Sequence, residues 1–184
     1  MRYGALALTA AAVAISVAAA AGVPEPPGYR LDDYRAPVPD TVTGGRVVHT
    51  RELQALLQHD QALPIDVLPA PRRPEGMRPD QPWMPVPRQD IPGSLWLPDV
   101  GRGMLSPALD QWFQDRLAQA TGGNKRRPLI FYCLSRCWMS WNATKRAAQY
   151  GYRRVYWYPD GSDGWEKAGL PLAEARPEPA PPMP

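Results

Sequence analysis

The sequence has few of the residues that build common catalytic and metal centres. Its 184 residues include only two histidines, two cysteines and two phenylalanines, and the formal net charge is +3. With His49 and His59 as the only histidines and no nucleophile-elbow motif, a Ser-His-Asp triad is not supported. The one basic run, at residues 125–127, lacks the broad stripe and interleaved aromatics of a nucleic-acid surface. We therefore expect no nucleic-acid partner.

The N-terminus predicts export. Arg2 precedes an apolar run at residues 5–19 that ends in small residues, which is the pattern of a secretory signal peptide over residues 1–21. The run is short and alanine-rich for a membrane span, so an uncleaved anchor is the less favoured alternative. We expect a periplasmic protein, without stable membrane anchoring once the signal peptide is cleaved. Cleavage leaves roughly 163 residues, enough for one domain with its own core.

Proline is abundant, with 24 residues gathered in three regions. These regions are an N-terminal extension (22–46), an insertion (69–90) and a C-terminal tail (173–184). Proline fixes the backbone and removes a hydrogen-bond donor, so such stretches exclude regular helices and central strands. The domain itself is predicted at residues 47–172. The insertion is expected to be either a loop packed on the domain or a lid or partner surface.

Strand and helix patterns alternate between these proline-rich regions. Short apolar runs predict strands near residues 47–48, 63–67, 95–97, 129–132 and 155–158. Helical patterns follow at 50–57, where Thr50 is the expected cap, and at 107–117, 139–150 and 161–168. Such alternation predicts an α/β fold, with one mostly parallel sheet of about five strands and helices on both faces.

Two polar features lie directly after the predicted buried strands. Asp66 follows an apolar run and is expected to fix loop backbone, and Cys133 follows the most apolar strand of the chain. A thiol between a strand end and a helix start is near backbone N–H groups and the positive helix end, which favour a thiolate. Cys137 lies four residues later. In an oxidising compartment the two can form a disulfide, although so small a loop gains little entropic stability from a bridge.

These motifs together resemble the rhodanese-like domain family. The resemblance covers residues 47–172 and rests on Thr50-Arg51-Glu52-Leu53, Ile65-Asp66-Val67, Ile91-Pro92-Gly93-Ser94, the strand-Cys133-loop-helix segment, and Gly164-Trp165-Glu166-Lys167-Ala168-Gly169-Leu170-Pro171. The segments around Cys137-Trp138 and from Val155 to Trp165 resemble, more narrowly, a rhodanese-like family with a cysteine-cysteine-tryptophan motif. That family is associated with pyrroloquinoline-quinone (PQQ)-dependent catabolism of alcohols.

The resemblance implies a single rhodanese-like domain in which Cys133 carries a persulfide, without a metal or organic cofactor. Arg136 and Trp138 stand where the family commonly has glycine and arginine, and Leu68 replaces the arginine usual after Asp-Val. The arginine that binds the substrate anion is therefore absent from its usual place, and Arg136 is the candidate to supply the charge.

Cys137 adds a second thiol that can attack a persulfide or sulfenate on Cys133. The first hypothesis is a sulfur-transfer or thiol-relay enzyme with Cys133 as nucleophile, Cys137 as resolving thiol and Arg136 as anion stabiliser. Leu134, Ser135 and Trp138 would then contact a small sulfur-containing or thiol substrate, and a periplasmic PQQ-dehydrogenase system is the expected partner.

Two alternatives stay open. One is a noncatalytic accessory or docking protein in which the bridge is structural and the proline-rich insertion forms the docking face. The other, less favoured, is Cu(I) binding by the two thiolates, for which only Met139 is a nearby third ligand.

Overall fold

The computed structural model describes residues 23–59 and 61–181, so the predicted signal peptide lies outside the described part of the chain. Five strands form one sheet in the order β1-β6-β5-β2-β4, and every neighbouring pair is parallel. The strands are β1 (Arg46–Val47), β2 (Leu63–Asp66), β4 (Leu95–Trp96), β5 (Leu129–Tyr132) and β6 (Val155–Trp157). The predicted α/β fold with a parallel sheet of about five strands is confirmed.

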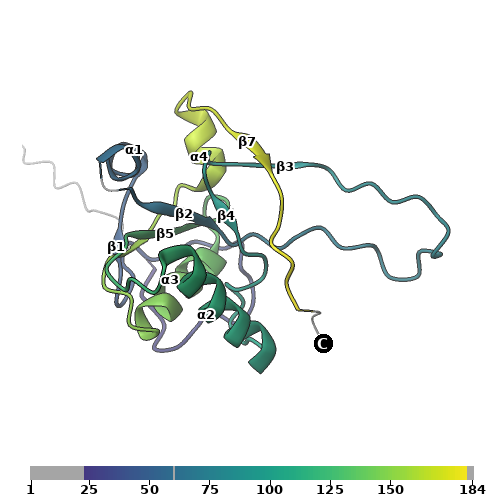
Figure 1. Cartoon of the computed structure of the whole chain (residues 1–184), viewed down its shortest axis with the longest axis horizontal. Coiled ribbons are helices and arrows are strands. Elements are labelled where there is room, and N and C mark those ends of the chain that lie inside the picture. Colours follow the sequence, from purple (N-terminus) through teal and green to yellow (C-terminus); the bar gives the residue numbers. More distant parts are fainter. Residues whose placement is uncertain (1–22, 60, 182–184) are drawn as a thin grey trace, which may run out of the picture.

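Helices cover both faces of this sheet, as predicted (Figure 1). They are α1 (Thr50–His59), α2 (Pro107–Thr121), α3 (Trp138–Gln149) and α4 (Gly161–Lys167). Alternate residues of β5 point to opposite faces. Leu129 and Phe131 pack in the cluster that contains α2 and α3 side chains, whereas Ile130 and Tyr132 pack in the cluster that contains Leu53 of α1 and Trp165 of α4. Strand β5 is thus buried on both sides, which explains its continuous apolar sequence.

Local capping sets where helix α2 begins and ends. The Ser106 side chain accepts a hydrogen bond from the N–H of Leu109 at 3.2 Å, and Pro107 occupies the first turn. At the other end Gly122 adopts a left-handed conformation with φ of 61°. The predicted capping role of Thr50 was wrong. Thr50 is already helical, and its hydroxyl lies 2.8 Å from the Tyr158 hydroxyl, so it ties α1 to the end of β6.

The N-terminal extension lies along α3 and is bonded to it through its backbone. The side chain of Asn142 accepts from the N–H of Arg30 at 2.9 Å and donates to the Arg30 carbonyl at 2.8 Å. The indole N–H groups of Trp138 and Trp141 donate to the carbonyls of Pro37 and Thr41. The hydroxyl groups of Tyr29 and Tyr34 also bond the extension to the domain, whereas Leu31 is 60% exposed.

Helix α3 is consequently enclosed on all sides. Ten of its twelve residues are buried, including the charged Lys145 and Arg146. The Arg146 guanidinium donates to the carbonyls of Val100 and Gly103, and the Lys145 ammonium donates to the carbonyl of Gly28. Buried charged groups require such partners because desolvation is otherwise costly. The extension thus completes the core on the side of α3 that faces away from the sheet.

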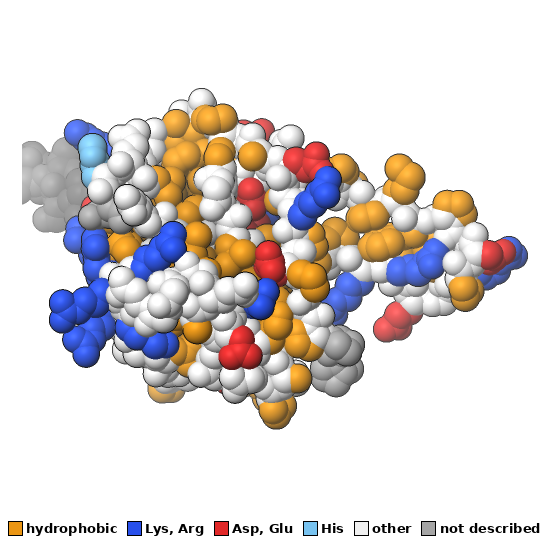
Figure 2. Space-filling view, in the orientation of Figure 1, with side chains coloured by type: hydrophobic (Ala, Val, Ile, Leu, Met, Phe, Trp, Pro, Cys, Tyr) orange, Lys and Arg blue, Asp and Glu red, His pale blue; other side chains and the backbone are white. Residues whose placement is uncertain are grey.

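The proline-rich insertion and tail meet in a small second sheet. Strand β3 (Arg88–Asp90) pairs antiparallel with β7 (Ala173–Ala175), at the end of the predicted insertion and the start of the predicted tail. The rest of the insertion projects from the body as a long loop (Figure 1). Apolar side chains, drawn in orange, lie along this projecting loop (Figure 2). Met84, within the insertion, is 91% exposed. Within residues 23–59 and 61–181, no helix is both long and apolar enough to cross a membrane.

Removing the Asn142 side chain tests the attachment of the extension. Asn142→Ala leaves the buried polar groups of Arg30 and Gly101 without partners, so we expect a loss of about 1–3 kcal/mol in the free energy of unfolding. Protease cleavage within residues 23–45 should also become faster. The control is Gln119→Ala on the exposed surface of α2, expected within about 0.5 kcal/mol of wild type. Equal stability of the two variants in denaturant titration would contradict this role for Asn142.

Candidate functional site: the Cys133–Cys137 loop

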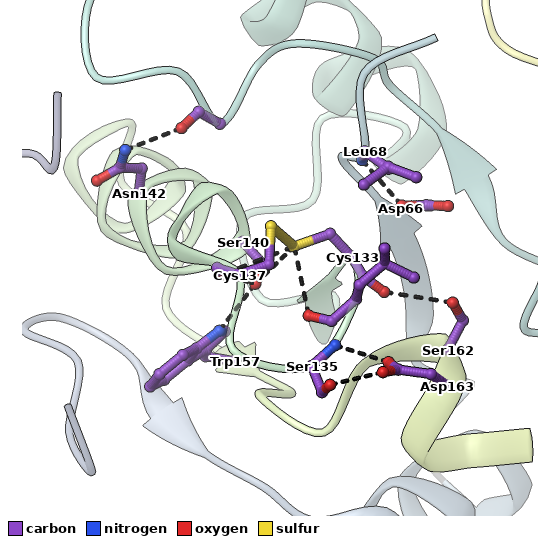
Figure 3. Close-up of a disulfide and its surroundings, with 12 residues drawn as sticks. Asp66, Leu68, Cys133, Ser135, Cys137, Ser140, Asn142, Trp157, Ser162 and Asp163 are labelled. Carbon is purple, nitrogen blue, oxygen red and sulfur yellow. Dashed lines mark hydrogen bonds between the residues drawn. A yellow bond between two sulfur atoms is a disulfide. The ribbon is translucent and has the colours of Figure 1, made fainter. Parts of the chain in front are cut away.

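The two cysteines form a disulfide at the junction between β5 and α3 (Figure 3). Cys133 is the first residue after β5, and Cys137 is the N-cap residue of α3, with Cα atoms 6.3 Å apart. Cys133 is fully buried and Cys137 is 3% exposed. Between them, Arg136 adopts a left-handed backbone conformation with φ of 54°, which turns the chain tightly enough to bring the two sulfurs together. A reagent can therefore reach the sulfurs only if the loop or its cover moves.

The carbonyl of Cys133 is fixed by the start of α4. The N–H of Ser162 donates to it at 2.9 Å, and the Ser162 hydroxyl lies 3.4 Å from it. Arg88 donates to that hydroxyl at 3.1 Å and pairs with the fully buried carboxylate of Asp66 at 2.7 Å. Asp66 also accepts from the N–H of Leu68 at 2.9 Å, so it fixes loop backbone as predicted. Although Leu68 replaces the family arginine, Asp66 still has a cationic partner, supplied from β3.

A carboxylate of α4 holds the middle of the loop. The N–H and hydroxyl of Ser135 donate to Asp163 at 2.6 and 2.5 Å (Figure 3). Burial opposes ionisation of Asp163, but the bonds from Ser135 and the charge of Lys167 outweigh it and hold its pKa below the usual range. Gly161, with φ of 68°, lies so close to the loop that a Cβ there would come within 2.3 Å of the Leu134 carbonyl carbon. These contacts place Leu134 and Ser135 against α4.

A pocket of about 300 Å³ lies beside the loop, and the side chains of Ser135 and Arg136 contribute to its lining. Its other walls include His49 and Asp160, with the His49 Nδ1 atom 3.0 Å from the Asp160 carboxylate. Arg136 is exposed beside this pocket, and its role in binding an anion stays a prediction. The His49 side chain is exposed. Its place before α1 brings it to the carboxyl ends of the strands, a proximity that depends on the folded topology.

Trp138 does not line the pocket beside the loop. Its side chain is 2% exposed and packs with Val42, Trp141 and Trp157, and its backbone N–H donates to the Tyr34 carbonyl at 2.9 Å. The first N–H of α3 is therefore bonded to the N-terminal extension rather than directed at a sulfur. The role of Trp138 as a substrate contact stays a prediction. Within the described residues, no group of three or more His, Cys, Asp or Glu side chains is arranged to hold a metal ion.

Two buried carboxylates lie behind the loop. Burial raises the pKa of Asp66, although Arg88 and the N–H groups of Leu68 and Val67 oppose the change. Burial and the nearby charge of Asp66 raise the pKa of Asp90 to about 6, against the opposing influence of Arg88. The single guanidinium of Arg88 thus lies beside two carboxyl groups and also contacts Ser162, so the charge of this cluster bears directly on the Cys133 carbonyl.

A cysteine held between a parallel strand and a helix N-terminus defines an α/β domain with a thiol site at the carboxyl end of its sheet. The rhodanese-like domain family matches residues 49–168, and the chain belongs to that family. A comparison with curated proteins found no match.

Among solved structures, the chain is similar to a thiosulfate sulfurtransferase from Pseudomonas aeruginosa, with 19% identity over 76% of this chain and 22% of that one, at a TM-score of 0.49. It is also similar to an EanB variant in complex with hercynine, with 19% identity over 77% of this chain and 34% of that one, at a TM-score of 0.51. A polysulfide-sulfur transferase homodimer from Wolinella succinogenes is 16% identical over 71% of this chain and 79% of that one, at a TM-score of 0.42. The chain therefore spans about a fifth to a third of the length of the first two. At these identities the likeness concerns the fold.

The raised pKa of Asp90 predicts a pH-dependent stability. A carboxyl group whose pKa is higher in the folded than in the unfolded state holds its proton more tightly when folded, so stability falls as the pH rises from about 4 to about 6. Asp90→Asn removes this contribution. Relative to wild type, the variant should gain at most about 3 kcal/mol in unfolding free energy between pH 4 and pH 7. A difference that stays constant with pH in denaturant titrations would refute this.

Proposed function

We propose that this protein is a periplasmic thiol relay that takes a sulfane sulfur on Cys133 and releases it as hydrosulfide through Cys137. The observation that carries the proposal is the disulfide between these residues at the strand-to-helix junction of a rhodanese-like domain. A one-cysteine loop can only pass the sulfur to an external acceptor. A second thiol within bonding distance adds an internal reductant, because formation of the disulfide supplies the two electrons that release the sulfur as hydrosulfide.

The proposed relay has three steps. The Cys133 thiolate attacks the outer sulfur of a persulfide donor and the sulfur–sulfur bond of the donor breaks. The rest of the donor leaves as a thiolate, and the outer sulfur remains on Cys133 as a persulfide. The Cys137 thiolate then attacks the Sγ atom of Cys133, the sulfur–sulfur bond of the persulfide breaks, and hydrosulfide leaves as the disulfide forms. An external dithiol reduces that disulfide, supplies two electrons and becomes a disulfide itself. Arg136, beside the loop pocket, would bind an anionic donor.

The alternative of a purely structural bridge has less support. Closing a five-residue loop stabilises a protein by only about 2 kcal/mol on the chain-entropy estimate. The loop is already held by hydrogen bonds from Ser162 to Cys133 and from Ser135 to Asp163. A bridge therefore adds little rigidity here, whereas its reversible opening supplies chemistry.

Two further parts of the proposal concern the setting. Export rests on the signal-peptide pattern at residues 1–21, and an oxidising compartment agrees with a chain whose two cysteines are paired. A link to PQQ-dependent alcohol oxidation rests on the sequence resemblance around Cys137-Trp138. Cell fractionation of the full chain tests the first, and growth on alcohols after deletion of its gene tests the second. Recovery in the cytosol, or unchanged growth, would remove the corresponding part.

Single-cysteine variants test the relay. Cys133→Ser should lower hydrosulfide release from a low-molecular-weight persulfide by at least about a thousandfold, because the nucleophile is lost. Cys137→Ser should still accept sulfur on Cys133, so intact mass should show one added sulfur atom while no hydrosulfide is released. Undiminished release by Cys133→Ser would refute the relay. If both variants keep full cellular function, the accessory-protein alternative is correct instead.

The proposed role of Arg136 has its own test. Arg136→Gln removes an exposed guanidinium beside the loop, so KM for an anionic persulfide donor should rise about tenfold with kcat unchanged. Arg126→Gln removes the same charge from the exposed turn before β5 and should leave KM unaltered. An uncharged donor should show no difference among the three proteins. Equal KM values for the anionic donor would mean that Arg136 does not bind it.

A further inference from the structure

The sulfur of Cys133 has few polar neighbours, and they differ in what they can donate. In the described part of the chain its polar contacts are the carbonyl oxygens of Leu134 at 3.8 Å and Cys137 at 3.6 Å, and the hydroxyl oxygen of Ser140 at 3.3 Å. A carbonyl oxygen can only accept a hydrogen bond, so it favours a protonated thiol and disfavours a thiolate. The Ser140 hydroxyl is the one group of the three that can donate to a thiolate.

The Ser140 hydroxyl is itself held in place. The indole N–H of Trp157 donates to it at 3.0 Å, and the hydroxyl donates to the Cys137 carbonyl, also at 3.0 Å (Figure 3). Ser140 is 1% exposed and Trp157 is fully buried, so water does not compete readily for these bonds. Because the indole can only donate, it occupies an acceptor position of the hydroxyl and leaves its single proton free for another partner.

We propose that Ser140 is a catalytic residue of the relay, and that Trp157 is the positioning residue that directs its hydroxyl. The inference rests on the proposed function and concerns the reduced state of the same site. In the disulfide form the Ser140 proton bonds to the Cys137 carbonyl. After reduction the hydroxyl turns to the Cys133 thiolate, a rotation about one side-chain bond in which no covalent bond changes and no proton is transferred.

This donor has two consequences. It lowers the pKa of the Cys133 thiol against the opposing carbonyl groups, which increases the fraction of nucleophilic thiolate. It also stabilises the reduced form relative to the disulfide, in which sulfur carries no charge, and so makes the pair more oxidising. Buried hydrogen bonds to charged groups are among the stronger ones, so one hydroxyl is sufficient for a measurable effect.

The pKa of Cys133 is measured most cleanly without its partner thiol, because two coupled thiols titrate as a pair. In Cys137→Ala protein, alkylation rate and thiolate absorbance are followed against pH with and without Ser140→Ala. We expect the added substitution to raise the Cys133 pKa by at least one unit, so that tenfold less thiolate is present at a pH below both values. Ser140→Thr keeps a hydroxyl and should restore a pKa near that of the parent.

The reduction potential gives an independent measurement. With both cysteines present, Ser140→Ala should shift the equilibrium with a reference dithiol about tenfold toward the disulfide, which corresponds to about 30 mV. Thr144→Val is the matched control, because its hydroxyl donates to the Ser140 carbonyl one turn further along the same buried helix. It should leave the Cys133 pKa and the potential unchanged.

Trp157→Phe keeps a ring in the core but loses the N–H group that orients Ser140, so both quantities should shift in the same direction by a smaller amount. If Ser140→Ala does not fold, the Cys133 pKa measured in Trp157→Phe tests the inference in its place. An unchanged Cys133 pKa in the folded Ser140 or Trp157 variants overturns the inference, even if hydrosulfide release proves that the relay exists. Conversely, if wild type releases no hydrosulfide, the relay fails, while a raised pKa in Ser140→Ala still supports the hydrogen bond to the thiolate.

Discussion

The hydrogen bond from the Ser162 N–H to the Cys133 carbonyl is the contact on which the geometry of the loop depends. It joins the end of β5 to the start of α4, and the Ser162 hydroxyl extends it to Arg88 and the buried carboxylate of Asp66. A buried ion pair adds little stability of its own, because desolvation offsets its attraction. The ion pair instead fixes positions, because strands β2, β3 and β5 and helix α4 are held together at one point directly behind Cys133.

Sequence patterns predicted the parts of the fold that depend on local periodicity. The apolar run at β5, the helix after Pro107 and Cys133 at a strand end are all visible in short windows of sequence, because burial imposes the pattern where it acts. The partner of Asp66 could not be found in this way. Arg88 lies 22 residues further along the chain, inside a proline-rich segment, and nothing local distinguishes it from the exposed arginines nearby.

The same limit applies to Trp138 and His49. The cover over Trp138 could not be read from its neighbours in the sequence, because its indole packs under residues 34–42, more than ninety positions earlier in the chain. His49 has no local motif, and only the parallel sheet brings it beside Asp160 and Arg136. Contacts between residues so far apart in the sequence depend on the topology of the whole fold. Trp138 and Trp141 of α3 are large apolar side chains that require cover, but nothing near them in the sequence identifies the segment that supplies it.

The burial of the two sulfurs also determines which of them an external thiol attacks in the proposed relay. Cys133 is fully enclosed, whereas Cys137, at the N-terminus of α3, retains slight exposure and lies next to the exposed Arg136. In the proposed relay we infer that, once the loop opens, the reductant attacks Cys137, the less enclosed residue, so the leaving group is the Cys133 thiolate. Exchange is faster when the leaving thiol has a lower pKa. The Ser140 hydroxyl lies beside that leaving sulfur, so the group that activates Cys133 as a nucleophile also assists its departure when the disulfide is reduced.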